Sequence, residues 1–331
     1  MSYMYAVARL RAMENRFLDA AFFTRLIECV TLEEALKSLG ETVYGQWITG
    51  GATPFDKIID AELIATCKDL EQFVPDKRLL DIYRMPYDFN NVKVILKSAF
   101  KAREGGERRH DLLSAMGAID TETLVLAIEG EEYGFLPYGL SDAIPHAWSV
   151  WEQTKSARDA ELVIDERLFA AMKKLAAALN IPGLVRWVEH RVDAENIGSA
   201  LRLARINIDP ATARGYFHKG GALSPDDVTR LMSEPFESWG KSLSHTSFGA
   251  IFDALQDRSD MQAVLCDVSK ELSASLIVVL SSAHYKTEAP ENVLLYLLQK
   301  DEEAKNLRIA LVCVANGLNR EFARRLLSHG R

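Results

Sequence analysis

The stretch Asp88-Phe89-Asn90-Asn91-Val92-Lys93-Val94-Ile95-Leu96 decides the expected fold of this 331-residue chain, because its pattern occurs twice more. The counterparts centre on Asn196 and Asn306, at successive spacings of 105 and 110 residues. Each Asn has an acid three positions before it, an aliphatic residue directly after it and a leucine five positions after it. Such periodic similarity indicates one structural unit used several times. We expect three units, at residues 1–107, 108–217 and 218–331.

The spacing of apolar residues predicts an all-α fold. They recur three and four positions apart along nearly the whole chain, as in Leu10, Met13 and Phe17. This spacing places side chains on one face of an α-helix, whereas the alternation typical of strands is scarce. The pairs Gly105-Gly106 and Gly220-Gly221 stand in polar surroundings and are expected to separate the units.

The repeated acid and Asn have two interpretations. They could form a functional pair, or the acid could cap a helix while Asn bonds the backbone of the first turn. A scaffold explains three copies better, because an active site is usually needed once. The acids are Asp88, Asp193 and Glu303.

A second repeated signature predicts helix N-termini. Thr31, Asp120 and Ser224 each precede a segment with acids in its first turn, as expected of N-cap residues. An aromatic residue followed by Gly then ends each element, because Gly tolerates a positive φ. These pairs are Tyr44-Gly45, Tyr133-Gly134 and Phe248-Gly249.

Composition narrows the class of partner. The formal net charge of -8 disfavours nucleic acid, unless basic residues gather on one face. The most apolar stretch, from Leu272 to Ala283, falls short of the roughly 20 residues that cross a bilayer. The N-terminus has no basic flank followed by an apolar run, so we expect no secretory signal and a cytoplasmic location.

The residue types that carry chemistry are scattered. The four cysteines and seven histidines lack the spacings of a metal or redox motif, and no Gly-rich phosphate loop is present. We expect no catalytic residue, cofactor or metal. Two basic clusters either serve solubility or meet acidic surfaces of partner subunits. They are Arg103, Arg108 and Arg109, and Arg320, Arg324 and Arg325.

Several segments resemble the C-subunit family of V/A-type ATPases, whose eukaryotic relative is the d subunit of the V-ATPase. The resemblance extends from the first ten residues to Asn316-Gly317, and the last segment is the most specific. Departures occur at Val312-Cys313-Val314 and between Ser269 and Ser282, without disturbing the helical phase. The matching segments are Tyr5–Glu14, Tyr87–Lys97, Asn306–Leu311 and Ala315–Leu318.

The resemblance implies a funnel of three similar helical domains in a pseudo-threefold arrangement. The protein would sit on the membrane rotor ring, receive the tip of the central shaft, and couple the ATP-processing head to ion movement. It would be a non-catalytic subunit, peripheral on the cytoplasmic face of the membrane. The sequence indicates neither the ion nor the direction of operation. The shaft socket is expected to include Tyr44, Tyr133 and Phe248.

Two other functions are compatible with a helical repeat protein. A free-standing scaffold would share the fold without rotor partners. A hydrolase or transferase would need a site assembled between units, and the absence of a clustered nucleophile disfavours it. Copurification with shaft and ring subunits would distinguish a rotor subunit from a free-standing scaffold. A cavity lined by ionisable groups with strongly shifted pKa values would support a hydrolase or transferase.

Overall fold

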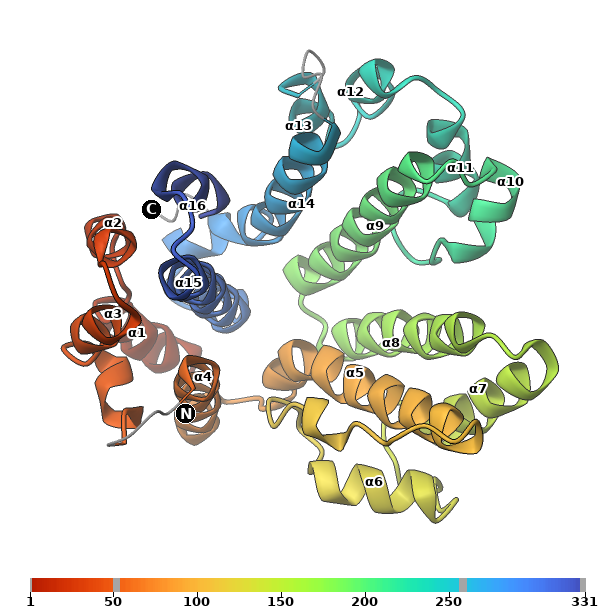
Figure 1. Ribbon diagram of the computed structural model, residues 1–331, viewed down its shortest axis with the longest axis horizontal. Helices are drawn as coiled ribbons and strands as arrows, with labels where there is room; N and C mark the ends of the chain where they lie inside the picture. The colour runs from red at the N-terminus through yellow and green to blue at the C-terminus, as the bar shows by residue number, and fades with distance from the viewer. Residues whose placement is uncertain (1, 50–53, 256–260, 328–331) are drawn as a thin grey trace. The chain divides into compact units, whose positions relative to one another are not determined.

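The computed structural model describes residues 2–49, 54–255 and 261–327, without the side chain of Met261. Every regular element in these ranges is an α-helix or a short 3₁₀ helix (Figure 1). The all-α prediction is therefore confirmed. The chain divides into two compact units, and the boundaries and pseudo-threefold arrangement of three expected units stay predictions.

Unit 1 combines residues from both ends of the chain, Met1–Tyr83 and Leu280–Arg331. Helix α15 packs against α1, α2, α3 and α4, so a C-terminal helix organises the N-terminal ones. The elements are α1 (Tyr3–Glu14), α2 (Ala20–Glu28), α3 (Leu32–Leu39), the 3₁₀ helix η1 (Val43–Trp47), α4 (Phe55–Phe73), the start of α5 (Arg78–Arg103), η5 (Ser281–Tyr285), α15 (Glu291–Ala315) and α16 (Arg320–Leu326).

Unit 2 is the continuous segment Arg84–Val279. Helix α8 packs on α7 and α9, and α9 packs on α11 and α14. Besides the rest of α5, the elements are η2 (His110–Leu112), α6 (Thr121–Glu129), α7 (Leu140–Thr154), α8 (Ala157–Leu179), α9 (Pro182–Arg205), α10 (Pro210–Ala213), η3 (Arg214–Tyr216), α11 (Pro225–Met232), η4 (Phe236–Ser238), α12 (Trp239–Ser242), α13 (Gly249–Asp253) and α14 (Met261–Val278).

In the first copy, the repeated acid and Asn lie in the middle of a long helix. Asp88 on α5 accepts hydrogen bonds from the amides of Ala118 and Ile119, at 3.1 and 3.0 Å. Asn91 exchanges two bonds of 2.8 Å with the backbone of Ser114. The prediction that these side chains cap their own helix was wrong, because α5 begins ten residues before Asp88. They hold instead the loop that leads into α6.

The second copy repeats this arrangement on α9. Asp193 accepts from the amides of Ala222 and Leu223, both at 3.0 Å. Asn196 exchanges two bonds of 2.8 Å with the backbone of His218. The loop held in this way leads into α11. The shared function of the motif is thus to satisfy loop amides before the next helix starts.

The third copy takes its loop from the other end of the sequence. Glu303 on α15 accepts a hydrogen bond of 2.5 Å from the amide of Leu18, 285 residues away. Leu18 directly precedes Asp19, the N-cap of α2. The last long helix therefore holds an N-terminal loop in the way that α5 and α9 hold the loops that follow them.

The three predicted N-caps are confirmed. Thr31, Asp120 and Ser224 accept hydrogen bonds from the amides three residues ahead, at 3.2, 2.9 and 3.2 Å. Ser224 forms a full capping box, because Asp227 accepts in return from the Ser224 amide at 3.0 Å. These bonds satisfy amides that have no partner within their helix.

The Ser224→Ala variant is expected to lower the free energy of unfolding by about 1 kcal/mol, because α11 loses its N-cap acceptor. Urea denaturation measures the change. Ser247→Ala is the matched control, since Ser247 is exposed and lies outside a helix, and it should leave stability within about 0.5 kcal/mol of the parent. Equal losses in both variants would contradict the role of the cap.

Candidate functional site

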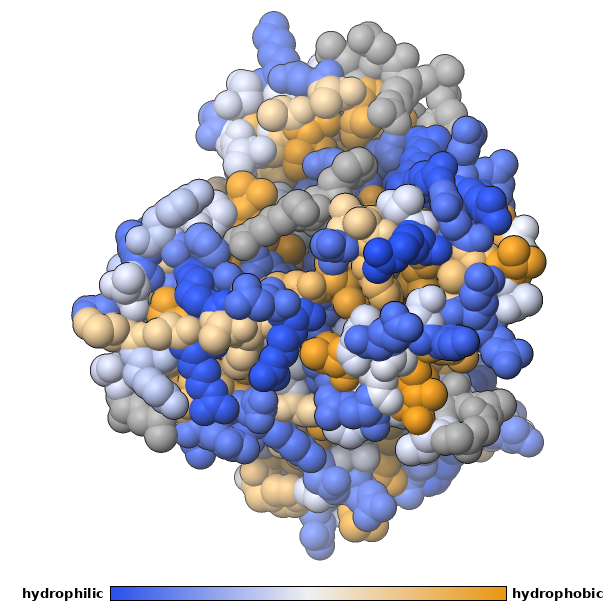
Figure 2. Space-filling view, turned by 90° about the vertical axis from the view of Figure 1, so that its left-hand side faces the viewer, coloured by the Kyte–Doolittle hydropathy of each residue, from blue (hydrophilic) through white to orange (hydrophobic). Residues whose placement is uncertain are grey.

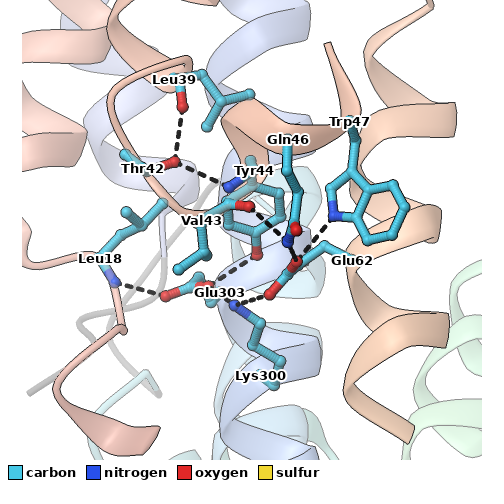
Figure 3. A network of polar contacts seen from close by, with 10 residues as sticks. All are labelled: Leu18, Leu39, Thr42, Val43, Tyr44, Gln46, Trp47, Glu62, Lys300 and Glu303. Carbon is cyan, nitrogen blue, oxygen red and sulfur yellow. Dashed lines mark hydrogen bonds and ion pairs between the residues drawn. The ribbon is translucent and has the colours of Figure 1, made fainter. Parts of the chain in front are cut away.

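A buried ammonium group lies at the centre of unit 1. The side chain of Lys300 on α15 is only 2% exposed, and its Nζ lies 2.7 Å from Oε1 of Glu303, one turn along the helix (Figure 3). Burial of a charge is costly unless opposite charges and hydrogen bonds surround it. The neighbouring elements supply both.

Helix α4 contributes the second carboxylate of this network. Oε1 of Glu62 lies 3.5 Å from Nζ of Lys300. Its other oxygen, Oε2, accepts hydrogen bonds from Nε1 of Trp47 at 2.9 Å and from Nε2 of Gln46 at 3.2 Å. The network therefore joins α4 and η1 to α15 (Figure 3).

Tyr44 completes the network. Its fully buried hydroxyl donates a hydrogen bond of 2.7 Å to Oε1 of Glu303, and its ring centroid lies 4.6 Å from Nζ of Lys300. Burial, followed by the charge of Glu303, raises the pKa of Tyr44 well above its usual value. The phenol therefore remains a proton donor at neutral pH. Two carboxylates and one ammonium, all with hydrogen-bonding partners, are suited to fixing helices together.

A cleft of about 350 Å³ opens beside this network in unit 1. Glu62 and Lys300 form part of its wall. The other polar residues that line it are Arg16, Thr42, Gln46, Thr66, Asp69 and Tyr296. Among the described residues, no group of three or more His, Cys, Asp or Glu is placed to hold a metal ion. No helix in the described ranges has both the length and the apolar character needed to cross a membrane.

A comparison with known families accounts for nearly the whole chain. Residues 6–326 match the model of the ATP synthase (C/AC39) subunit family. The chain belongs to this family. The predicted membership and the prediction of a non-catalytic subunit are thereby confirmed.

Individual relatives of this C/AC39 subunit align over most of both chains. The C subunit of the V-type sodium ATPase of Enterococcus hirae is 22% identical, with 94% of each chain covered. The C subunit of the A-type ATP synthase of Methanococcoides burtonii is 22% identical over 98% of this chain and 94% of its own. The C subunit of the V-type ATP synthase of Thermus thermophilus is 24% identical over 93% of this chain and 92% of its own.

The three aromatic residues predicted to line a socket differ in exposure within the C/AC39 subunit. Tyr44 and Phe248 are 0% and 1% exposed, so in this structure their rings present no surface to another protein. The Phe248 ring stacks on His190, with centroids 4.4 Å apart. Tyr133 is partly exposed. Contact of Tyr133 with a partner stays a prediction.

The first basic cluster is exposed on unit 2. Arg103 lies over the Trp148 ring at 4.5 Å and bonds Glu152 at 3.1 Å. Arg108 pairs with Glu129, and Arg109 pairs with Asp111 at 2.8 Å. Solvent-exposed pairs of this kind contribute little to stability, so the arginines remain able to meet a partner.

The second basic cluster lies on α16 in unit 1. Arg320 donates a hydrogen bond of 3.0 Å to the Glu28 carbonyl, and Arg324 bonds the Glu28 carboxylate at 2.8 Å. Arg325 is exposed. Large apolar side chains are also exposed in unit 1, and Figure 2 shows hydrophobic areas interspersed with hydrophilic ones on one face. Partner contacts of both basic clusters stay predictions.

Burial perturbs two titratable side chains of α9. It lowers the pKa of His190 to about 4. It also raises the pKa of Asp193 to about 6, against the opposite effect of the Leu223 and Ala222 amides. The neutral His190 contributes stability that is complete above its unfolded pKa of about 6.5 and is lost as the pH falls towards 4. The contribution of Asp193 to stability has the opposite pH dependence: it is present at low pH and is lost as the pH rises through about 6.

The His190→Gln variant is therefore expected to lose less stability than the parent between pH 6.5 and pH 4. Urea denaturation at several pH values measures the difference in free energy of unfolding between the variant and the parent. Both proteins contain Asp193, so its contribution largely cancels in this difference. His146→Gln is the matched control, because His146 is exposed on α7 and its loss should leave the pH dependence of the parent unchanged. Parallel curves for His190→Gln and the parent would exclude the predicted effect.

Proposed function

We propose that this C/AC39 subunit is a central-stalk subunit of a V/A-type rotary ATPase or ATP synthase. It joins the central shaft of the ATP-processing head to the membrane rotor ring, so that rotation in one is coupled to ion transport in the other. The observation that carries the proposal is the family match over residues 6–326, together with relatives named as C subunits that align over more than nine-tenths of both chains.

The construction of unit 1 supports a role in transmitting torque. Transmission of torque requires a body that resists deformation, and closely packed helices provide one. The buried network of Lys300, Glu303 and Glu62 adds contacts that fix α15 against α4 and η1. A rotor part built in this way transfers rotation with little internal movement.

The exposed basic clusters are the proposed contacts with acidic surfaces of the shaft and of the ring subunits. These clusters are positively charged, whereas the chain as a whole has a formal net charge of -8. Complementary charges guide association and fix the orientation of partners. Through these partners the protein is held at the cytoplasmic face of the membrane.

Affinity purification from the native membranes tests the proposal. The tagged full-length chain is recovered after detergent solubilisation, and mass spectrometry identifies its partners. We expect shaft and ring subunits of the same rotary ATPase, with an unrelated tagged protein as the control. Recovery of the chain in repeated preparations without either kind of subunit would favour a free-standing scaffold.

Charge-reversal variants separate the two clusters. Two triple variants are purified in the same way. One carries Arg103→Glu, Arg108→Glu and Arg109→Glu, and the other carries Arg320→Glu, Arg324→Glu and Arg325→Glu. We expect each variant to lose rotor partners that the unmodified chain retains. Unchanged recovery of every partner in both variants would assign the arginines to solubility alone.

A further inference from the structure

The cleft in unit 1 contains polar side chains that the fold itself leaves without hydrogen bonds. Tyr296 is 3% exposed and Thr66 is 6% exposed, and both line the cleft. Within the described residues, neither hydroxyl makes a hydrogen bond to protein. Because both residues line the cleft, their hydroxyls are reached from it and are available to a ligand that donates or accepts hydrogen bonds there.

The charges around the cleft favour a cation. Glu62, Thr66 and Asp69 follow one another at spacings of four and three residues, so α4 presents them on one face. Asp69 has no ion pair in the part of the chain that the structure describes. Lys300 is already shared by Glu62 and Glu303, which leaves one excess negative charge in the buried network.

The hydroxyl of Tyr296 is suited to accept from such a cation. Burial, followed by the charges of Glu303 and Glu62, raises its pKa, so the group stays neutral at physiological pH. Arg16 also lines the cleft, but its side chain is exposed and makes no hydrogen bond or ion pair within the described ranges. The Arg16 side chain can therefore turn towards solvent and leave the cleft open to the cation.

We propose that this cleft binds one guanidinium or primary ammonium group, which pairs with Asp69 and Glu62 and donates hydrogen bonds to the hydroxyls of Thr66 and Tyr296. The cation is either a Lys or Arg side chain of a partner subunit or a free amine. The volume of about 350 Å³ accommodates a single side chain of this kind. The site lies within one compact unit and does not rest on the proposed function.

Trp47 provides a local reporter of binding. Its indole N–H donates to Oε2 of Glu62, so a cation beside that carboxylate changes the indole resonance. The full-length ¹⁵N-labelled chain is titrated with agmatine, and the Trp47→Phe variant assigns the signal. We expect a saturable shift of the Trp47 indole signal, with no such shift on titration with inorganic phosphate. A shift with phosphate instead, or no shift at several millimolar agmatine, would overturn the proposal.

Conservative variants test the individual contacts. Asp69→Asn should weaken agmatine binding about tenfold, and Tyr296→Phe about threefold, because each removes one partner of the cation. Tyr296→Phe should fold normally, since it deletes a hydroxyl that makes no bond to protein. The matched controls are Asp142→Asn and Tyr285→Phe, both at exposed positions, and they should leave affinity unchanged. Equal affinity of all four variants would overturn the assignment.

Arg16 separates cation from anion binding. Arg16→Gln should strengthen agmatine binding, because a positive charge leaves the cleft. Loss of binding in this variant would show that Arg16 is the ligand-binding group and would overturn the proposal. Addition of agmatine during the affinity purification from native membranes then identifies the source of the cation. Lower recovery of a rotor subunit points to a partner side chain, and unchanged recovery to a free amine.

Discussion

The Lys300→Met variant is expected to lose about 3–5 kcal/mol of its free energy of unfolding. Met keeps much of the length of the side chain but removes the ammonium that lies 2.7 Å from Glu303 and 3.5 Å from Glu62. Two buried carboxylates then face each other without a countercharge. Removal of one partner from a buried ion pair costs far more than the pair contributes, because the remaining charge stays desolvated.

Lys305→Met is the matched control for this experiment. Lys305 also lies on α15 and pairs with Asp301 at 3.1 Å, but 48% of its side chain is exposed. Loss of an exposed pair should cost about 0–1 kcal/mol. Urea denaturation of both variants and the parent measures the losses, and hydrogen exchange in α4 and α15 locates them. Comparable losses in the two variants would refute the central role of the buried ammonium.

The Gly221→Ala variant is expected to lower the free energy of unfolding by about 2–4 kcal/mol. A Cβ at this position would lie 1.9 Å from Oδ1 of Asp193, so the carboxylate has to move. That oxygen accepts from the Leu223 amide, and its neighbour accepts from the Ala222 amide. Displacement leaves the buried Leu223 amide without its acceptor and weakens the start of α11.

The control for steric conflict is Gly215→Ala, in the same unit. Apart from its two chain neighbours, no described residue places an atom within 4 Å of the position that its Cβ would occupy. This variant should be neutral or slightly stabilising, because Ala restricts the unfolded chain. Thermal denaturation compares the two variants, and exchange protection of the Leu223 amide reports the local effect. Retained protection in Gly221→Ala would contradict the mechanism.

The features of this structure that depend on residues close together in the chain could be predicted from the sequence. Helix periodicity and N-cap chemistry act over three or four residues, so the all-α fold and the caps at Thr31, Asp120 and Ser224 followed from pattern alone. The alignment around Asn91 and Asn196 also pointed to equivalent residues. What their side chains contact was not predictable, because the loops that they bind lie 22–31 residues further along the chain.

The buried network was missed because it joins three distant segments. A signal was nevertheless present. Lys300 and Glu303 lie one turn apart shortly after the apolar run Leu294–Leu298, and Glu62 lies between the apolar residues Ile59 and Leu63. Charges at apolar positions of a predicted helix indicate buried pairing. The pairing of Glu303 with Leu18 needed the fold itself, since the chain ends show no pattern that relates them.

The closure of unit 1 by its last long helix also fixes an order of events during synthesis on the ribosome. Residues 1–83 emerge early, yet Glu303, which holds the loop before α2, emerges some two hundred residues later. At 5–20 residues per second, the interval lasts roughly 10–40 s. During this time unit 2 can fold as a continuous segment, while apolar N-terminal helices wait without their partner. The nascent N-terminal region is therefore the part of this chain that chaperones are most needed to shield.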